Sequence, residues 1–243
     1  MTIDLHIPTC WKELTTEQLR EIVELALMGL HREEYLLVLF CKFAGVKIVP
    51  GTPNADGSEA VKTRFADAEG HEFELEDWQV SDFCGHLAFV LDEQMPMESP
   101  WPFKWDRYLM DTSFGNWFHA DAQLLGYALE GDPKRLMGAM ADLGDPHETL
   151  EPSDITLMLR WYECLTDWLQ ERYPLVFKKA KPGEASTASP VEARQNIMLM
   201  LNDDKPQDNE RIENANVHDV LAALQHKIEY AKHVEEQMNK LNH

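Results

Sequence analysis

The sequence predicts a mainly α-helical protein, a multi-helix bundle with a small antiparallel β-hairpin insertion near residues 46–75. Apolar residues recur at helical spacing over most of the chain. Helix-capping residues precede several of these periodic segments. Alternating apolar residues are confined to one short stretch, and with 243 residues, 44% of them hydrophobic, the chain can bury a core.

Two helices are expected first. Thr15 to Gln18 has the pattern of a capping box, and apolar residues then follow on one face, so the first helix should span about residues 16–28. A second apolar stripe covers residues 31–44, and Gly45 follows where a left-handed C-cap would lie. The two segments predict a helical hairpin.

The β insertion is expected next. Residues 46–49 form a short β-branched run, and residues 50–58 are rich in turn formers, which indicates a surface loop. Residues 61–65 and 72–75 alternate apolar and polar side chains and predict a two-stranded hairpin. A helical pattern resumes at Ser81 and should end before Pro96.

Three aromatic residues crowd an irregular, proline-rich segment after that helix. They are Trp101, Phe103 and Trp105. The favoured interpretation is an aromatic plug that closes the core. The alternative is a surface that binds a ligand or a partner protein, and we keep the three residues as candidate partner-binding residues on that interpretation.

The middle of the chain predicts three more helices. One should begin near Phe114 and end near Gly131. Asp132 and Pro133 should open the next, because Asp is a good N-cap and Pro is tolerated at the first helical position. A long helix should begin at Pro152 and stop at Pro174, with apolar residues over more than half of its circumference, so it should be central to the core.

The chain is expected to divide after this helix. Residues 1–177 should form the main domain with its β insertion, residues 178–190 a small-residue linker, and residues 191–243 a C-terminal helical segment. In that segment we expect a short helix over residues 191–201, a polar run over residues 202–209, and a final helix from Val217 capped by Asn216.

The final helix has a narrow apolar stripe, which suggests packing on one neighbour, either a partner protein or another copy of the chain. A homo-oligomer formed through this helix is therefore one expectation. The candidate partner-binding residues on the stripe are Val220, Leu224, Ile228 and Val234.

Charge and targeting signals narrow the classes of partner. The chain has 43 Asp and Glu residues and 22 Lys and Arg residues, a formal charge of −21, which disfavours nucleic acids and anionic membranes and favours a basic partner. We find no signal peptide and no run of about 20 apolar residues, and we therefore expect a cytoplasmic protein. The four scattered cysteines are typical of reduced thiols.

Three sets of polar residues were weighed as chemical sites. His226, Glu229 and His233 could share a helix face and bind a metal, but a polar helix face produces the same spacing. Asp82 could orient the imidazole of His86 as a general base, yet no nucleophile motif accompanies the two residues. Twelve carboxylates lie between Asp56 and Glu98, and they favour a solvated acidic face over a calcium loop. The sequence predicts no catalytic, metal or cofactor site.

One further pattern extends over most of the chain. The segment from Pro8 to Leu19, the segment from Phe114 to Asp121, the segment from Trp161 to Phe177 and the closing helix from Val217 together resemble small helical proteins encoded in the tail-morphogenesis region of tailed bacteriophages and prophages. These proteins are often described as tail assembly chaperones.

This resemblance implies a non-enzymatic role: binding a long, aggregation-prone tape-measure protein while tail-tube subunits polymerise around it. Two alternatives remain. One is a structural subunit of the virion, which would stay in the finished particle. The other is an enzyme or small-ligand binder, for which polar groups such as Asp82, His86 and His119 would have to converge around a cavity.

Overall fold

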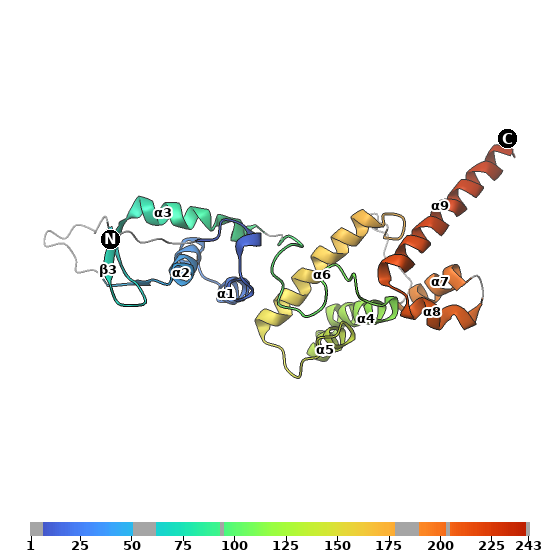
Figure 1. Ribbon diagram of the computed structural model, residues 1–243, viewed down its shortest axis with the longest axis horizontal. Helices are drawn as coiled ribbons and strands as arrows, with labels where there is room; N and C mark the ends of the chain where they lie inside the picture. The colour runs from blue at the N-terminus through green and yellow to red at the C-terminus, as the bar shows by residue number, and fades with distance from the viewer. Residues whose placement is uncertain (1–6, 51–61, 93–94, 178–189, 203–204, 242–243) are drawn as a thin grey trace. The chain divides into compact units, whose positions relative to one another are not determined.

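The computed structural model describes residues 7–50, 62–92, 95–177, 190–202 and 205–241. These residues form a mainly helical protein with one small antiparallel sheet, which confirms the predicted fold class (Figure 1). The chain folds into two compact units. The first comprises Met1–Pro102 and Pro152–Arg160, and the second comprises Phe103–Glu151 and Trp161–His243.

The first unit begins with a helical hairpin. A 3-10 helix, η1 (Trp11–Glu13), precedes α1 (Thr16–Leu27), and α2 (Arg32–Ala44) follows. The predicted capping box is present: the backbone N–H of Gln18 donates to the Thr15 hydroxyl at 3.2 Å, and the backbone N–H of Thr15 donates to the Gln18 side chain at 2.9 Å. Gly45 ends α2 in the left-handed conformation, with φ of 66°, as expected.

The sheet of the first unit has three antiparallel strands in the order β1 (Lys47–Ile48), β2 (Lys62–Ala66) and β3 (Glu72–Glu76). The predicted hairpin is therefore confirmed, and the β-branched run before it adds a third strand. Phe65 pairs with Phe73 in the register of β2 and β3, and its ring packs edge-on against Phe40 of α2 at 5.6 Å. This fully buried phenylalanine joins the sheet to the helices.

Helix α3 (Asp77–His86) begins earlier than the predicted start at Ser81 and follows β3 without a loop. The Gln79 side chain accepts a hydrogen bond from the backbone N–H of Glu76 at 3.0 Å, which stabilises the first turn in place of the usual Ser, Thr, Asp or Asn cap. The predicted helical pattern continues as a separate 3-10 helix, η2 (Ala88–Leu91).

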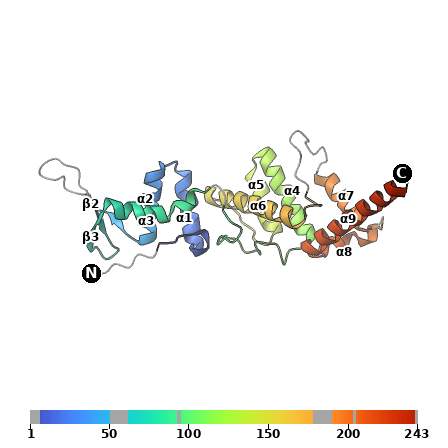
Figure 2. The same ribbon diagram turned by 90° about the horizontal axis from the view of Figure 1, so that it is seen from above.

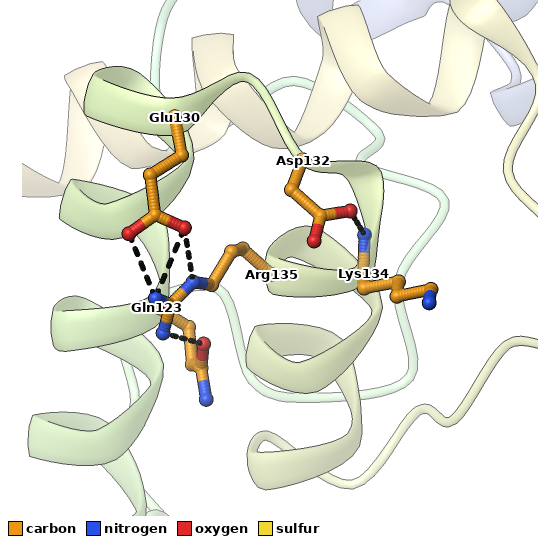
Figure 3. A network of polar contacts seen from close by, with 5 residues as sticks. All are labelled: Gln123, Glu130, Asp132, Lys134 and Arg135. Carbon is orange, nitrogen blue, oxygen red and sulfur yellow. Dashed lines mark hydrogen bonds and ion pairs between the residues drawn. The ribbon is translucent and has the colours of Figure 1, made fainter.

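The second unit contains the predicted helices α4 (Phe114–Glu130) and α5 (Pro133–Asp142). Asp132 caps α5 by accepting from the backbone N–H of Lys134 at 3.0 Å, as expected. Figure 3 shows how Arg135 of α5 holds the end of α4: its guanidinium donates to the Glu130 carboxylate at 2.9 Å and to Gln123 at 3.3 Å. This pairing adds to the close packing of α4 against α5.

Helix α6 (Pro152–Arg172) runs through residues of both units. In the second unit its buried face supplies Trp161, Leu165 and Leu169, which agrees with the prediction that this helix is central to the core. The Trp161 indole N–H donates to the backbone carbonyl of Arg107 at 3.1 Å, so the largest buried side chain of the helix has its polar atom paired.

The C-terminal region of the second unit contains α7 (Pro190–Asn202), the 3-10 helix η3 (Pro206–Asp208), α8 (Asn209–Asn214) and α9 (Val217–Leu241). The short helix α8 was not predicted, because its six residues bury only Ile212 and show no apolar period. None of the helices in the described part of the chain combines the length and the hydropathy of a membrane span.

The expected division at the 178–190 linker stays a prediction, because residues 178–189 lie outside the described residues. The two compact units are divided elsewhere: the C-terminal helices belong to the same unit as α4 and α5. Contacts between α4 and both α8 and α9 account for this grouping.

Candidate protein-binding site

The first two turns of α9 are held firmly in the second unit. Val217 and Leu221 are fully buried, and the backbone N–H of Val217 donates to the carbonyl of Thr112 at 3.0 Å. The side-chain oxygen of Asn216 accepts from the backbone N–H of His218 at 2.8 Å, so the predicted cap is present. These contacts fix where α9 starts.

His218 joins the start of α9 to the end of α6. One ring nitrogen, Nε2, lies 2.6 Å from the carbonyl oxygen of Tyr108, and the other, Nδ1, lies 3.0 Å from the hydroxyl of Tyr173. Because a carbonyl can only accept, Nε2 carries a proton and donates it. Trp168 packs edge-on against the same imidazole at 5.5 Å. Both ring nitrogens are thereby used for anchoring.

An apolar pocket of about 200 Å³ opens between α7, α8 and α9. It is lined by five apolar residues and two charged ones: Leu201, Ile212, Ala215, Val220, Ala223, Arg211 and Asp219. This volume is below the roughly 300–1,000 Å³ of sites for drug-sized ligands. The pocket can hold one or two apolar side chains of a partner. Arg211 and Asp219, which are exposed, can pair with charged residues of the same partner.

Exposed apolar side chains also lie on two of the helices that line the pocket, α7 and α9. Leu199 and Met200 are exposed near the end of α7, where Lys227 of α9 donates to the carbonyl of Met200 at 2.7 Å. On α9, Tyr230 is 65% exposed and Met238 is 59% exposed.

The distal half of α9, residues 225–241, extends beyond α7 and α8 (Figures 1 and 2). Tyr230, Val234 and Met238 recur every four residues and so share one face of the helix. Lys227, which contacts α7, lies on that face as well, because it precedes Val234 by seven residues. The pocket and the distal face therefore form one surface, which we call the α7–α9 surface.

Charge on the distal half of α9 differs from that of the whole chain. Residues 225–241 contain three Lys and three Glu residues, whereas the chain has a formal charge of −21. A partner that approaches the distal half meets no net charge there, apart from the histidines. The α7–α9 surface should therefore recognise a partner through apolar contacts and not through long-range electrostatic attraction.

The C-terminal candidates from the sequence occupy different places around this surface. Val220 lines the pocket, and Leu224 is buried beside it. Ile228 and Val234 are half-buried farther along α9. The sequence did not single out Leu199, Met200 or Tyr230, although the spacing of Tyr230 from Val234 places both on one face.

The aromatic candidates lie apart from the α7–α9 surface. Phe103 and Trp105 stack at 4.4 Å, and Trp105 meets Trp161 edge-on at 5.1 Å, so this group packs within the second unit with Trp105 buried. Trp101 belongs to the first unit, where its indole N–H donates to the carbonyl of Met97 at 3.0 Å. The structure brings Phe103 and Trp105 together in a packed aromatic cluster.

The residues weighed for catalysis do not line the pocket. Asp82 and His86 are exposed on α3, with a carboxylate oxygen 3.8 Å from Nε2, and His119 is exposed on α4 in the second unit. A catalytic or ligand-binding role would require these three residues to converge around one cavity. The pocket described above instead has mainly apolar residues from α7, α8 and α9.

The residues weighed for metal binding are all exposed on α9. His233 lies 2.8 Å from the side chain of Gln237, one turn farther along. Within the described ranges, no group of three or more His, Cys, Asp or Glu side chains is placed to hold a metal ion.

The chain was compared with protein families, curated proteins and solved structures. No protein-family model matches the chain, and neither a curated protein nor a solved structure matches it.

Proposed function

We propose that this protein is a non-enzymatic assembly chaperone that binds an apolar helical segment of a partner protein on the α7–α9 surface. The observation that carries the proposal is the continuity of that surface. An apolar pocket at the start of α9 continues onto the exposed face of the same helix, and exposed Leu199 and Met200 lie near the end of the neighbouring α7. Exposed apolar patches of this kind mark protein-interaction sites more often than scattered apolar residues do.

A helix is the segment that fits this surface best. Tyr230, Val234 and Met238 present side chains at helical spacing along a straight element, so a partner helix can lie beside α9 and contact each turn. One or two of its apolar side chains would fill the pocket. Each large apolar side chain that becomes fully buried contributes about 1.5–3 kcal/mol.

The resemblance to tail assembly chaperones names the class of partner. We propose a long tape-measure-like protein, held in the cytoplasm of the producing cell before tail-tube subunits polymerise around it. The high negative charge of the chain supports this role, because like-charged complexes repel one another and stay soluble while apolar segments are held.

Affinity capture with surface variants tests the proposal. The full chain, a Leu199→Ser/Met200→Ser variant and a Leu129→Ser control are expressed in the producing cell, and captured proteins are identified by mass spectrometry. Leu129 is a matched control because it is 88% exposed on α4, away from the lining of the pocket. We expect a long chain to be captured by the full chain and the control and lost from the double variant.

A second measurement separates chaperone activity from simple binding. The captured long chain is purified, and its aggregation is followed by light scattering with and without the present protein. We expect aggregation to be suppressed by the full chain and by the Leu129→Ser control but not by the double variant. Equal capture by all three proteins, or aggregation that the full chain does not slow, contradicts the proposal.

A further inference from the structure

A second surface, on the first unit, has the features of a docking site. Helix α3 contains Trp78, Val80 and Phe83, yet none of its ten residues is buried. Helices α1 and α2 in the same unit each bury four residues. Figure 1 shows α1 and α2 on one side of α3. Val80 and Phe83 are half-buried, and Phe83 stacks on Phe40 of α2 at 5.3 Å, so Trp78 is the apolar side chain of α3 that its own unit leaves uncovered.

The exposed face of α3 has one large side chain, Trp78, beside small ones. Trp78 is 68% exposed, the largest exposed fraction of any tryptophan in the described chain. Ser81 and Gly85 follow at the spacing of one helix turn, and a Cβ atom added to Gly85 would meet nothing within 4 Å. A partner can therefore approach the backbone of α3 closely and still contact the indole of Trp78.

The charges of this region determine which partner fits. Residues 62–92 contain eight Asp and Glu residues and two cations, Lys62 and Arg64. Lys62 pairs with Glu76 at 3.0 Å, and Arg64 lies 3.6 Å from Glu74, so both cations are already engaged by the sheet. Asp77 and Asp82 are exposed on the same face of α3 as Trp78. A cationic partner is complementary to this face.

We infer that the face of α3 formed by Asp77, Trp78, Ser81, Asp82 and Gly85 docks a segment of another protein that contains Lys or Arg. The cation packs on the indole of Trp78 and pairs with the adjacent carboxylates. Tryptophan is among the residues that most often dominate binding free energy at interfaces. A second copy of the chain is disfavoured as the occupant, because its formal charge of −21 repels this face.

This docking surface is separate from the α7–α9 surface. It lies in the other unit. It recognises a cationic side chain, whereas the α7–α9 surface recognises apolar side chains. The protein would thus hold a basic segment with one unit and an apolar segment with the other. Both segments can belong to one long partner or to two partners.

Photo-crosslinking in the producing cell tests the inference. The full-length chain carries the photoreactive residue p-benzoylphenylalanine in place of Ser81, which leaves Trp78 intact, and a control chain carries it in place of exposed Leu129. We expect a cross-linked partner from position 81 that is absent from position 129. The cross-linked segment should contain Lys or Arg, and the same chain with Trp78→Ala should lose most of the adduct.

A binding measurement then quantifies the contact. The cross-linked segment is synthesised with a fluorescent label, and its anisotropy is measured with the purified full chain. Because Trp78 is exposed, Trp78→Ala should fold normally, as its circular dichroism would show, and weaken binding about tenfold. Asp82→Asn should weaken binding a few-fold and reduce its dependence on salt, because only a charge is removed.

Three results would overturn the inference. They are an adduct no stronger at position 81 than at position 129, a cross-linked segment without Lys or Arg, and equal affinity for the full chain and Trp78→Ala. The Leu199→Ser/Met200→Ser variant distinguishes the two sites. If it loses the adduct at position 81 as well, α3 is not a separate docking surface, whereas retained cross-linking supports the inference even if the α7–α9 surface binds nothing.

Discussion

The two halves of α9 belong to one continuous helix but differ in burial: the first is packed in the second unit and the distal half is largely exposed. The first turns bury Val217, Leu221 and Leu224 and are tied by His218 to the loop and helix beside them. The distal half exposes Tyr230 and Met238, and Figures 1 and 2 show it extending beyond α7 and α8. Isolated helices of this length are marginal in water, so the distal half depends on the anchored half for its nucleation.

This difference shows that apolar spacing alone does not indicate what a helix face contacts. In the anchored half the stripe meets the protein's own core, and in the distal half a similar stripe has no described neighbour to cover it. Substitutions in the two halves should therefore affect different measurements, stability in the first and binding in the second.

The largest expected effect comes from the anchored half. Leu221→Ala removes a fully buried side chain and should lower the free energy of unfolding by about 2–5 kcal/mol, because it leaves a cavity between α9 and its neighbours. Urea denaturation followed by circular dichroism measures this change. The control is Met238→Ala in the exposed half, which should change stability by less than about 0.5 kcal/mol. Equal losses from the two substitutions would contradict the comparison.

His218→Ala should have the next largest effect. It removes the hydrogen bond to the Tyr108 carbonyl and one of those to the Tyr173 hydroxyl, which keeps longer contacts with Arg172 and the backbone carbonyl of residue 218, and we expect a cost of about 1–3 kcal/mol. Amide hydrogen exchange should quicken at residues 217–224. His218→Gln keeps a donor that can reach the Tyr108 carbonyl and should recover part of the loss. If alanine and glutamine behave alike, packing of the ring, and not hydrogen bonding, holds the helix.

Substitution of the exposed face should separate binding from folding. Tyr230→Ser together with Met238→Ser should change the free energy of unfolding by no more than about 1 kcal/mol, because both side chains are largely exposed. The same variant should bind the captured long chain about tenfold more weakly. Affinity is measured by titration of the purified proteins. Unchanged affinity would exclude the distal half of α9 from the binding surface.

The smallest expected effect is a pH dependence in the core that supports the anchored half. Burial raises the pKa of Asp121 of α4, although a hydrogen bond from Tyr162 of α6 acts in the opposite direction. A carboxyl whose pKa is raised on folding is most favourable when protonated. The free energy of unfolding should therefore fall as pH rises from the ordinary aspartate pKa of 3.8 to the raised value.

Asp121→Asn tests this pH dependence, because it should remove that slope while preserving the shape of the side chain. Exchange at residues 217–224, corrected for the intrinsic effect of pH, should follow the stability of the unit. Exchange at residues 230–241 should stay fast throughout. A slope that persists in Asp121→Asn would assign the titration to another group.

Much of the secondary structure could be predicted from local signals. The Thr15–Gln18 capping box, Gly45 after α2 and Asp132 before α5 each act within one helix turn, and all three lie where the sequence indicated. The start of α3 and the whole of α8 were missed. Glu76 is not a usual cap, and six residues with one buried side chain contain no period to detect.

The candidate binding site was only partly visible in the sequence. The stripe on α9 indicated Val220, Leu224, Ile228 and Val234, but periodicity could not show that Val220 and Leu224 are buried while Tyr230 is exposed. Leu199 and Met200 were missed because their exposure depends on where α7 ends against α9. Trp78 was also missed, because the predicted helix began at Ser81 and left Trp78 outside it.

The sequence by itself determined the helical class, most helix boundaries, the sheet insertion and the acidic charge, because each depends on neighbouring residues or on composition. Only the tertiary structure decided which apolar faces are covered: Phe103 and Trp105 pack against Trp161, whereas Trp78, Tyr230 and Met238 remain open. The physical reason is that burial depends on contacts between segments distant in the chain, and a local pattern of residues contains no information about its partner.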